Sequence, residues 1–313
     1  MQQNDQLSPG YGYEPPVFDR STIPESLQLT NGERYSVRGL FGRGGFSTVY
    51  RAYQRITQDP HINLLSLHSS GKLINPPRGC SEDVIITEPC GPSIRDIMTR
   101  ASMDAGYGQM ATFSISDIKQ IGRQIGEALF HLEKLQIYHL DIKAANVTFT
   151  NTNVKYKVDS NSTIPIITMS ELQIKLIDYG NSMSHWAPGT ARPMLAQPQN
   201  SRAPEVFMAI FTHQSGASQN EKQQSQFEYM VSTMNATIPE EMIEMSRHGR
   251  RCQLNFDFLK NRQENNNQDL LMNLMREDTD LPLFEFLKFV LIFNPTQRPS
   301  FEEVLNHEFL TNF

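Results

Sequence analysis

The sequence is poor in cysteine and in long apolar runs, and each scarcity excludes a class of protein. Its three cysteines, Cys80, Cys90 and Cys252, are too few for a disulfide framework and lack the paired spacing of a zinc site. The longest apolar stretch, residues 283–293, is interrupted by two charged residues and is too short to cross a bilayer. We therefore expect a chain that works in a reducing compartment and does not associate with a membrane.

An excess of positive charge and a secretory leader are missing as well. The chain carries 28 Lys and Arg against 34 Asp and Glu, and at a net charge of -6 direct nucleic-acid binding is not expected. Residues 1–20 contain no apolar core behind a basic start, which predicts an intracellular protein without a secretory signal. With 313 residues the chain is long enough to bury one large core or two modest ones.

Residues 137–147 hold a polar cluster between apolar neighbours. Asp141 follows His139 and stands two residues before Lys143 and five before Asn146. A carboxylate, an ammonium group and an amide at this spacing can place a hydroxyl in line with a phosphate and neutralise the phosphate charge. The segment is therefore the first candidate for a catalytic site.

Two further segments carry the residue types of a phosphate site. A short apolar run ends in Asp178-Tyr179-Gly180, which supplies a second carboxylate. Residues 40–50 contain Gly42, Gly44 and Gly45 between two stretches of alternating polar and apolar residues. This pattern is typical of a strand, a glycine turn and a returning strand, which can lay backbone amides over phosphates.

In this order, and followed by Ala203-Pro204-Glu205, the motifs resemble those of a eukaryotic protein kinase over roughly residues 34–313. Residues 238–243 look like the Pro-x-x-Met-Ile of the DYRK, LAMMER (CDC-like) and pre-mRNA-processing kinases, a branch of the CMGC group. The resemblance implies an α+β fold of two lobes, with a reduced β-rich N-lobe and a mainly helical C-lobe.

The resemblance also implies a role for each site residue. Asp141 is the implied catalytic base and Lys143 steadies the γ-phosphate, while Asn146 and Asp178 hold Mg²⁺. The implied contacts to ATP come from Gly42, Gly44, Gly45, Ser47, Val49 and Glu88, the last at the hinge beside the adenine. ATP and Mg²⁺ are thus the implied cofactors, and a protein is the implied substrate or partner.

Composition and periodicity predict how the chain is divided. Residues 1–32 are expected to form a flexible tail and residues 33–313 a kinase-like domain, with the N-lobe at 33–89 and the C-lobe at 90–313. Strands are expected over 34–40, 47–52, 62–67, 73–74 and 84–89, and helices after Ser93, Ser114 and Ser300 and within 281–293. A polar insertion spans 151–172, as in the LAMMER kinases, and the resemblance implies an ion pair between Arg298 and Glu205.

The N-terminal half lacks parts that the resemblance calls for. Residues 53–83 contain neither a strand with the phosphate-binding lysine nor its partner helix. Lys72 is the one lysine in that segment, and its surroundings favour a solvated turn residue over a replacement ligand. We expect this loss to weaken catalysis more than any other.

The C-terminal half departs from the pattern too. Leu140 replaces the Arg that binds an activation-loop phosphate, and Pro198 has no hydroxyl to bridge Asp141 and Lys143. Residues 206–221 contain no Asp-x-Trp-Ser-x-Gly helix to tie down the catalytic loop. Such block-like losses are typical of a splice form, an incorrect gene model or a decayed paralogue.

Three interpretations of function follow. The favoured one is a pseudokinase-like interaction module of serine/threonine kinase lineage, which binds Mg-ATP but whose phosphotransfer is weak or lost. The second is an active serine/threonine protein kinase acting on splicing-factor-type substrates, and the third is a truncated product that does not fold stably. The nucleus, as an alternative to the cytoplasm, and a splicing-related partner rest on the family resemblance alone.

Overall fold

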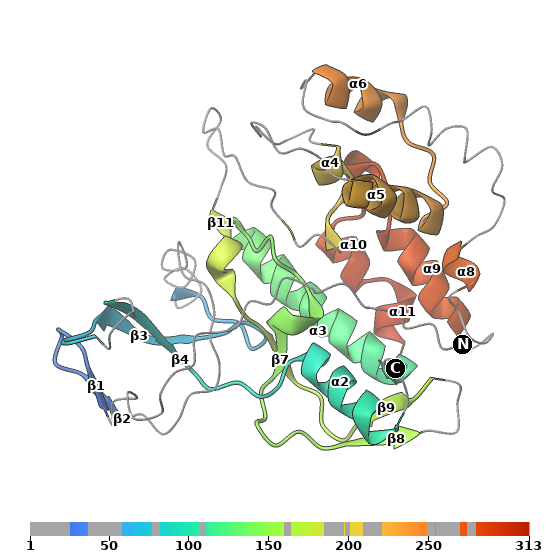
Figure 1. The fold of residues 1–313 in the computed structure, drawn as a ribbon. Coiled ribbons are helices and arrows are strands. Elements are labelled where there is room, and N and C mark those ends of the chain that lie inside the picture. Colours follow the sequence, from blue (N-terminus) through green and yellow to red (C-terminus); the bar gives the residue numbers. More distant parts are fainter. Residues whose placement is uncertain are drawn as a thin grey trace, which may run out of the picture. The chain divides into compact units, whose positions relative to one another are not determined.

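The computed structural model describes residues 26–36, 58–76, 82–106, 111–159, 164–184, 197, 201–208, 221–248, 254, 270–273 and 280–312. Its packing divides the chain into two compact units. Figure 1 labels helices and strands of the described residues. The first comprises Met1–Gly44 and His68–Ile86, and the second comprises Gly45–Leu67 and Thr87–Phe313. The expected returning strand at 47–52 lies outside the described residues.

The first unit contains a hairpin of β1 (Ser26–Gln28) and β2 (Arg34–Ser36), paired antiparallel. Gly32 has a φ of +94° in the connecting turn, which a residue with a side chain rarely adopts. Leu29 is fully buried and forms a β-bridge with Leu73. The hairpin therefore begins inside the segment that the sequence assigns to the tail.

A two-stranded sheet of β3 (Leu67–Lys72) and β4 (Asp83–Thr87) follows. β4 confirms the strand expected at 84–89, whereas the strand expected at 62–67 is wrong. Those residues form a turn, in which Asn63 donates its side-chain amide to the carbonyl of Ile174 and Leu64 bridges Leu176. Burial of the turn against a distant strand explains its apolar sequence without a local strand.

The second unit contains two helices, α2 and α3, that each begin at a capping serine. α2 (Ile94–Asp104) begins at Ser93, which closes a capping box with Asp96. α3 (Ile115–Lys134) begins at Ser114, whose hydroxyl accepts from the amide of Asp117 at 3.2 Å. The expected helices are confirmed. The Asp117 carboxylate does not close a capping box with Ser114 and accepts from the amide of Met169 at 2.9 Å. The N-terminus of α3 is thereby tied to the polar insertion.

That insertion forms a hairpin of β8 (Tyr156–Asp159) and β9 (Ile166–Met169). β9 also pairs in parallel with β5 (Thr112–Phe113), which gives a three-stranded sheet in the order β5-β9-β8. Ile167 is fully buried and Met169 nearly so, while the residues between and beside them alternate toward solvent. The insertion is thus a folded part of the second unit.

Two short antiparallel ladders carry the segments singled out in the sequence. β6 (Ile137–Tyr138) pairs with β11 (Met183–Ser184), and β7 (Val147–Phe149) pairs with β10 (Ile174–Leu176). The 3-10 turns η2 (Ala144–Asn146) and η3 (Tyr179–Asn181) lie between the ladder strands. The ladders therefore bring residues 139–146 and 177–182 together.

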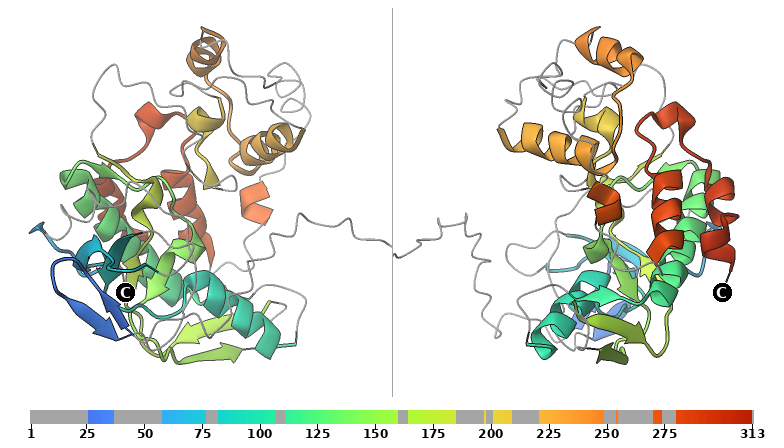
Figure 2. Two further views of the ribbon diagram at one scale, coloured as in Figure 1. Left: turned by 60° about the vertical axis from the view of Figure 1, so that its left-hand side comes forward. Right: turned by 90° about the vertical axis from the view of Figure 1, so that its right-hand side faces the viewer.

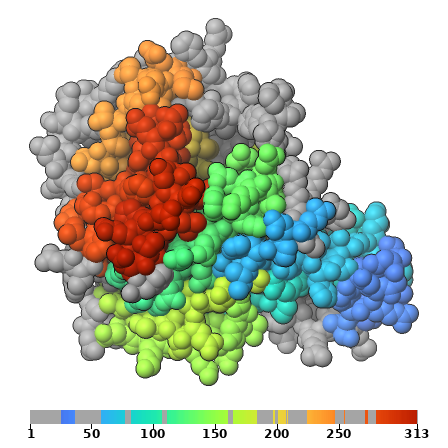
Figure 3. All heavy atoms as spheres, turned by 180° about the vertical axis from the view of Figure 1, so that it is seen from behind, coloured from blue at the N-terminus to red at the C-terminus, as the bar shows by residue number. Residues whose placement is uncertain are grey.

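The remaining described helices are α4 (Pro204–Phe207), α5 (Glu221–Thr233), α6 (Glu240–His248), α8 (Leu270–Asn273), α9 (Leu281–Val290), α10 (Phe301–Leu305) and α11 (Glu308–Thr311), with the turn η6 (Pro295–Gln297). α10 and α11 pack against α3, and α9 packs against α11 (Figures 2 and 3). A second apolar core consists of Met208, Phe227, Val231, Ile238, Met242, Ile243, Leu254 and Phe293. In the described ranges no helix is both long and apolar enough to span a membrane.

Candidate active site

His139 fixes the start of the segment that carries the candidate catalytic residues. His139 is 3% exposed, its Nε2 lies 2.9 Å from the carbonyl oxygen of Ile177, and its Nδ1 accepts from the amide of Asp141 at 3.2 Å. These contacts require a neutral imidazole with the proton on Nε2. Burial lowers the pKa of His139, despite the opposing effect of the Ile177 carbonyl and two nearby carboxylates.

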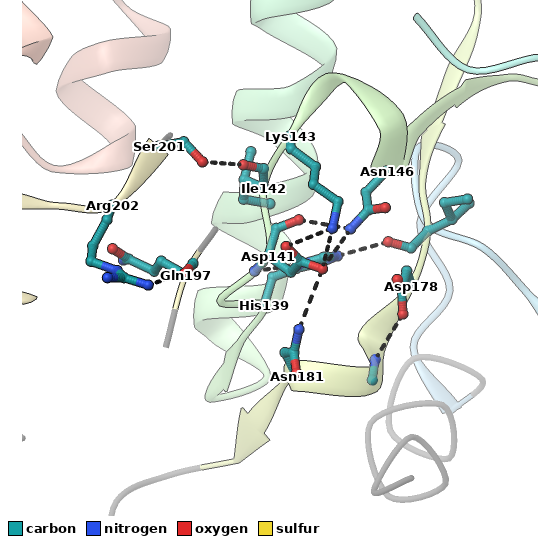
Figure 4. A network of polar contacts seen from close by, with 12 residues as sticks. His139, Asp141, Ile142, Lys143, Asn146, Asp178, Asn181, Gln197, Ser201 and Arg202 are labelled. Carbon is teal, nitrogen blue, oxygen red and sulfur yellow. Dashed lines mark hydrogen bonds and ion pairs between the residues drawn. The ribbon is translucent and has the colours of Figure 1, made fainter. Parts of the chain in front are cut away.

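Asp141 lies at the centre of a network of donors (Figure 4). It is 4% exposed. Lys143 Nζ contacts Oδ1 at 3.0 Å and Oδ2 at 2.8 Å, and Asn146 Nδ2 donates to Oδ2 at 3.0 Å and to the main-chain oxygen at 2.9 Å. The structure thus brings together three of the residues that the sequence predicts.

The side-chain oxygens of Asn146 and Asp178 are suitable ligands for Mg²⁺. Asn146 uses its amide nitrogen on Asp141, so its amide oxygen is turned to the other side. The exposed Asp178 accepts a hydrogen bond from the amide of Gly180 at 3.3 Å, and the neighbouring Ile177 donates its amide to the Asn146 carbonyl at 2.9 Å. One carboxylate and one amide oxygen on adjoining segments suit Mg²⁺, which keeps other positions for water and phosphate.

Left-handed backbone at two positions shapes these segments. Leu140 has a φ of 62° and Asp178 a φ of 64°. Leu140 lines a pocket of about 230 Å³ together with Leu129, Ile137 and Phe301. Its apolar side chain carries no charge for a phosphate, and the absence of a phosphate switch here stays a prediction.

Glu88 is anchored through its side chain. Its carboxylate contacts Lys175 Nζ at 2.8 Å and accepts from the amide of Ser66 at 2.8 Å. Partial burial raises the pKa of Glu88, but these donors outweigh the burial and the pKa is lowered. The predicted contact of this hinge segment with adenine stays a prediction.

Lys175, the partner of Glu88, is a buried charged residue that the sequence reasoning missed. It is 8% exposed, and it also donates to the carbonyl oxygen of Leu64 at 3.0 Å. A lysine inside the apolar strand β10 was the available signal, because a buried ammonium group needs partners. By contrast, Lys72 forms an exposed 3.6 Å ion pair with Glu82, as expected for a solvated lysine.

Two polar contacts were also not anticipated. Asn181 Nδ2 lies 3.3 Å from Asp141 Oδ2, and the hydroxyl of Ser201 donates to the carbonyl oxygen of Ile142 at 3.1 Å. The expected ion pair is confirmed, since both terminal nitrogens of Arg298 donate to Glu205, at 2.8 and 2.6 Å. Gly42, Gly44, Gly45, Ser47 and Val49 lie outside the described residues.

Comparisons with known proteins agree with this geometry. The family model of the protein kinase domain matches residues 84–310. The serine/threonine-protein kinase AFC3 of Arabidopsis thaliana is 22% identical over 216 residues, which are 59% of this chain and 52% of that protein. The human dual specificity protein kinase CLK4 is 23% identical over 223 residues, 63% of this chain and 45% of that protein.

A solved structure has the same fold. The crystal structure of the PF14_0431 kinase domain matches with a TM-score of 0.62 and 20% identity, over 85% of each chain. The chain spans about half the length of the two curated relatives, which belong to the CDC-like branch expected from the sequence. The expected α+β kinase fold is confirmed, and the chain belongs to the protein kinase domain family.

Proposed function

We propose that this protein binds Mg-ATP and transfers the γ-phosphate to serine or threonine hydroxyls of proteins only weakly. The observation that carries the proposal is the buried carboxylate of Asp141, held by Lys143 and Asn146. This arrangement is the proton-accepting half of a phosphotransfer site, while the sequence lacks the usual lysine on the phosphate side.

Each residue of the network has a chemical role in the proposal. Asp141 accepts the proton of the substrate hydroxyl, and the adjacent ammonium of Lys143 offsets the charge of the transferred phosphate. Asn146 and Asp178 would hold Mg²⁺, which neutralises phosphate charge when it is bound. The loop that carries them is prearranged, because His139 and Asn146 bind the main chain around Ile177.

The weakness of transfer follows from the missing lysine. Lys72 is the one lysine in residues 53–83, and it is exposed and paired with Glu82 in the first unit. Loss of one preorganised group that stabilises transition-state charge costs about a hundred- to a thousandfold in rate. Magnesium and phosphate contacts do not depend on the missing lysine alone. Nucleotide binding is therefore retained although phosphate transfer is slow.

A protein interaction module without transfer is the second candidate, and the same missing lysine favours it. In either case the partner is a protein. The names of the relatives, a serine/threonine-protein kinase and a dual specificity protein kinase, support a hydroxyl-bearing protein substrate. A splicing-related substrate and a nuclear location belong to this proposal by family resemblance.

The first experiment measures thermal unfolding of the purified chain with and without Mg-ATP. Nucleotide at a hundred times its dissociation constant should stabilise the folded protein by about 2.7 kcal/mol. Asp178→Asn should reduce that gain, whereas Asp159→Asn, in the exposed strand β8, should keep it. A transition indifferent to nucleotide would contradict Mg-ATP binding, and no cooperative transition would mean that the chain does not fold stably.

Phosphotransfer is then measured with γ-labelled ATP and a Ser-containing peptide library. Weak transfer that Asp141→Asn abolishes and Asp159→Asn leaves intact supports the kinase proposal. Nucleotide binding without any transfer above the Asp141→Asn background would favour the interaction module instead.

A further inference from the structure

Asn181 is the last residue of η3, the turn that begins after Asp178. Asn181 is exposed, yet its side-chain amide points at the buried Asp141 (Figure 4). A carboxylate only accepts hydrogen bonds, so the amide end toward it must be the NH₂ group. This contact connects the turn after the metal-binding aspartate with the proton acceptor.

The two oxygens of Asp141 have unequal partners. Within the described residues, Oδ2 receives Lys143 at 2.8 Å, Asn146 at 3.0 Å and Asn181 at 3.3 Å, whereas Oδ1 receives Lys143 alone at 3.0 Å. Each carboxylate oxygen offers about two lone pairs. Oδ2 is therefore fully used, and Oδ1 keeps room for one more donor.

The inequality comes from the two amides. Lys143 contacts both oxygens and so does not distinguish them, while Asn146 and Asn181 both select Oδ2. Two donors on the same oxygen restrict rotation of the carboxylate about its Cβ–Cγ bond. We propose that Asn181 is a positioning residue that, with Asn146, turns Oδ1 of Asp141 toward the substrate hydroxyl. This inference rests on the proposed function.

Asn181 is itself held firmly enough to position another group. Tyr179, at the start of the same turn, is fully buried, its hydroxyl donates to the carbonyl of Leu176 at 3.1 Å, and its ring lies 5.1 Å from that of His139. After the turn, β11 pairs with β6. An exposed side chain thus stands on an anchored backbone, as positioning of the carboxylate requires.

The turn η3 also connects the proposed metal ligand with the proposed positioning residue. Asp178, the proposed metal ligand, and Asn181 are at its two ends. Any shift of this turn therefore withdraws Asn181 from Asp141 at the same time as it moves the metal-binding carboxylate. Proton acceptance and metal binding are in this way coupled through three residues of backbone.

The kinetic test compares the wild type with Asn181→Ala and Asn181→Asp, and uses Asn153→Ala, an exposed asparagine away from the site, as the matched control. Asn181→Ala should lower kcat for a Ser peptide about tenfold, less than the roughly 10²–10⁴-fold that general acid–base catalysis contributes as a whole, because Asp141 is kept and only its orientation is lost, while KM for ATP and the unfolding temperature stay unchanged. Asn181→Asp should lower kcat further, because it replaces a donor with a second carboxylate. An unchanged kcat, or a loss of kcat that parallels a loss of stability, overturns the proposal.

A structural test does not depend on transfer. High-resolution crystal structures of the wild type and Asn181→Ala should show the Asp141 carboxylate rotated or spread over two orientations in the variant alone. An Asp141 that superposes in both overturns the positioning role. A protein that shows the rotation but transfers no phosphate keeps the positioning role and refutes the proposed function, so the two failures are distinguishable.

Discussion

Replacing Arg298 by Ala should be among the costlier single substitutions in the second unit. The guanidinium makes two parallel bonds to Glu205, at 2.8 and 2.6 Å, and donates to the carbonyl oxygens of Ile292 at 2.8 Å and Phe293 at 3.1 Å. These contacts join α4 to the chain segment between α9 and α10. Arg298→Ala removes all four at once.

The magnitude follows from burial. The Arg298 side chain is 26% exposed and that of Glu205 is 12% exposed. Removing one partner of a buried pair costs about 3–5 kcal/mol, and the partial exposure of the arginine puts the expectation at the lower end, about 3 kcal/mol. Arg298→Lys keeps the charge but loses the fork, so about half of that loss is expected to remain.

The assay is equilibrium unfolding in urea, with the pair Arg123 and Glu127 as matched control. That pair is joined at 2.9 Å, but its side chains are 42% and 34% exposed, so solvent screens it and its coupling energy should stay below about 1 kcal/mol. A double-mutant cycle on each pair separates the coupling from other losses. A coupling for Arg298 and Glu205 no larger than that of the control would refute the reasoning.

Three further outcomes are expected. The free energy of unfolding in urea should fall as the pH drops below about 6.5, because burial lowers the pKa of His139 and the unfolded state binds the proton more readily. His139→Gln should make this fall smaller. An equal dependence on pH in the variant would contradict the role of His139. Lys175→Met should lower the free energy of unfolding in urea by about 2 kcal/mol, because Glu88 loses its cation, and Lys175→Met with Glu88→Leu should recover part of that loss. A double variant as unstable as the sum of both single ones would argue against the pair. Gly91→Ala should destabilise by about 2 kcal/mol because a Cβ there overlaps the main-chain carbonyl oxygen of Asn151, whereas Gly122→Ala meets only ordinary contacts and should fold normally. Equal thermal stability of the two variants would show that the backbone around Gly91 moves to accept the Cβ.

Local signals in the sequence account for the helices that were predicted correctly. Ser93 and Ser300 each close a capping box with an acidic residue three positions later, and such a box needs no distant partner. The start of α3 was predicted for the same reason, although its Asp117 is used on β9. The candidate catalytic cluster could also be predicted from the sequence, because Asp141 and its neighbours lie within one short segment.

Long-range contacts decided what the sequence could not reveal. The apolar run 62–67 has the pattern of a strand, but Leu64 is buried by Leu176, more than a hundred residues later, and the run forms a turn. The sequence placed Glu88 at the hinge beside the adenine, but it did not reveal that the Glu88 carboxylate forms an ion pair with Lys175. Asn181 has no periodicity or motif of its own, and its role depends on where η3 places it.

Leu140 and Asp178, the left-handed residues in the loops 139–146 and 177–182, make the conformations of these two loops depend on each other. A non-glycine residue in this region costs about 1–2 kcal/mol, and neither loop holds its shape by local bonds alone. His139 and Asn146 bind the main chain at Ile177. These hydrogen bonds offset the conformational energy of the left-handed residues only when both loops are in place. In hydrogen exchange, the amides of Asp141 and Ile177 should therefore become accessible in one opening event, with one free energy, although they are far apart along the chain.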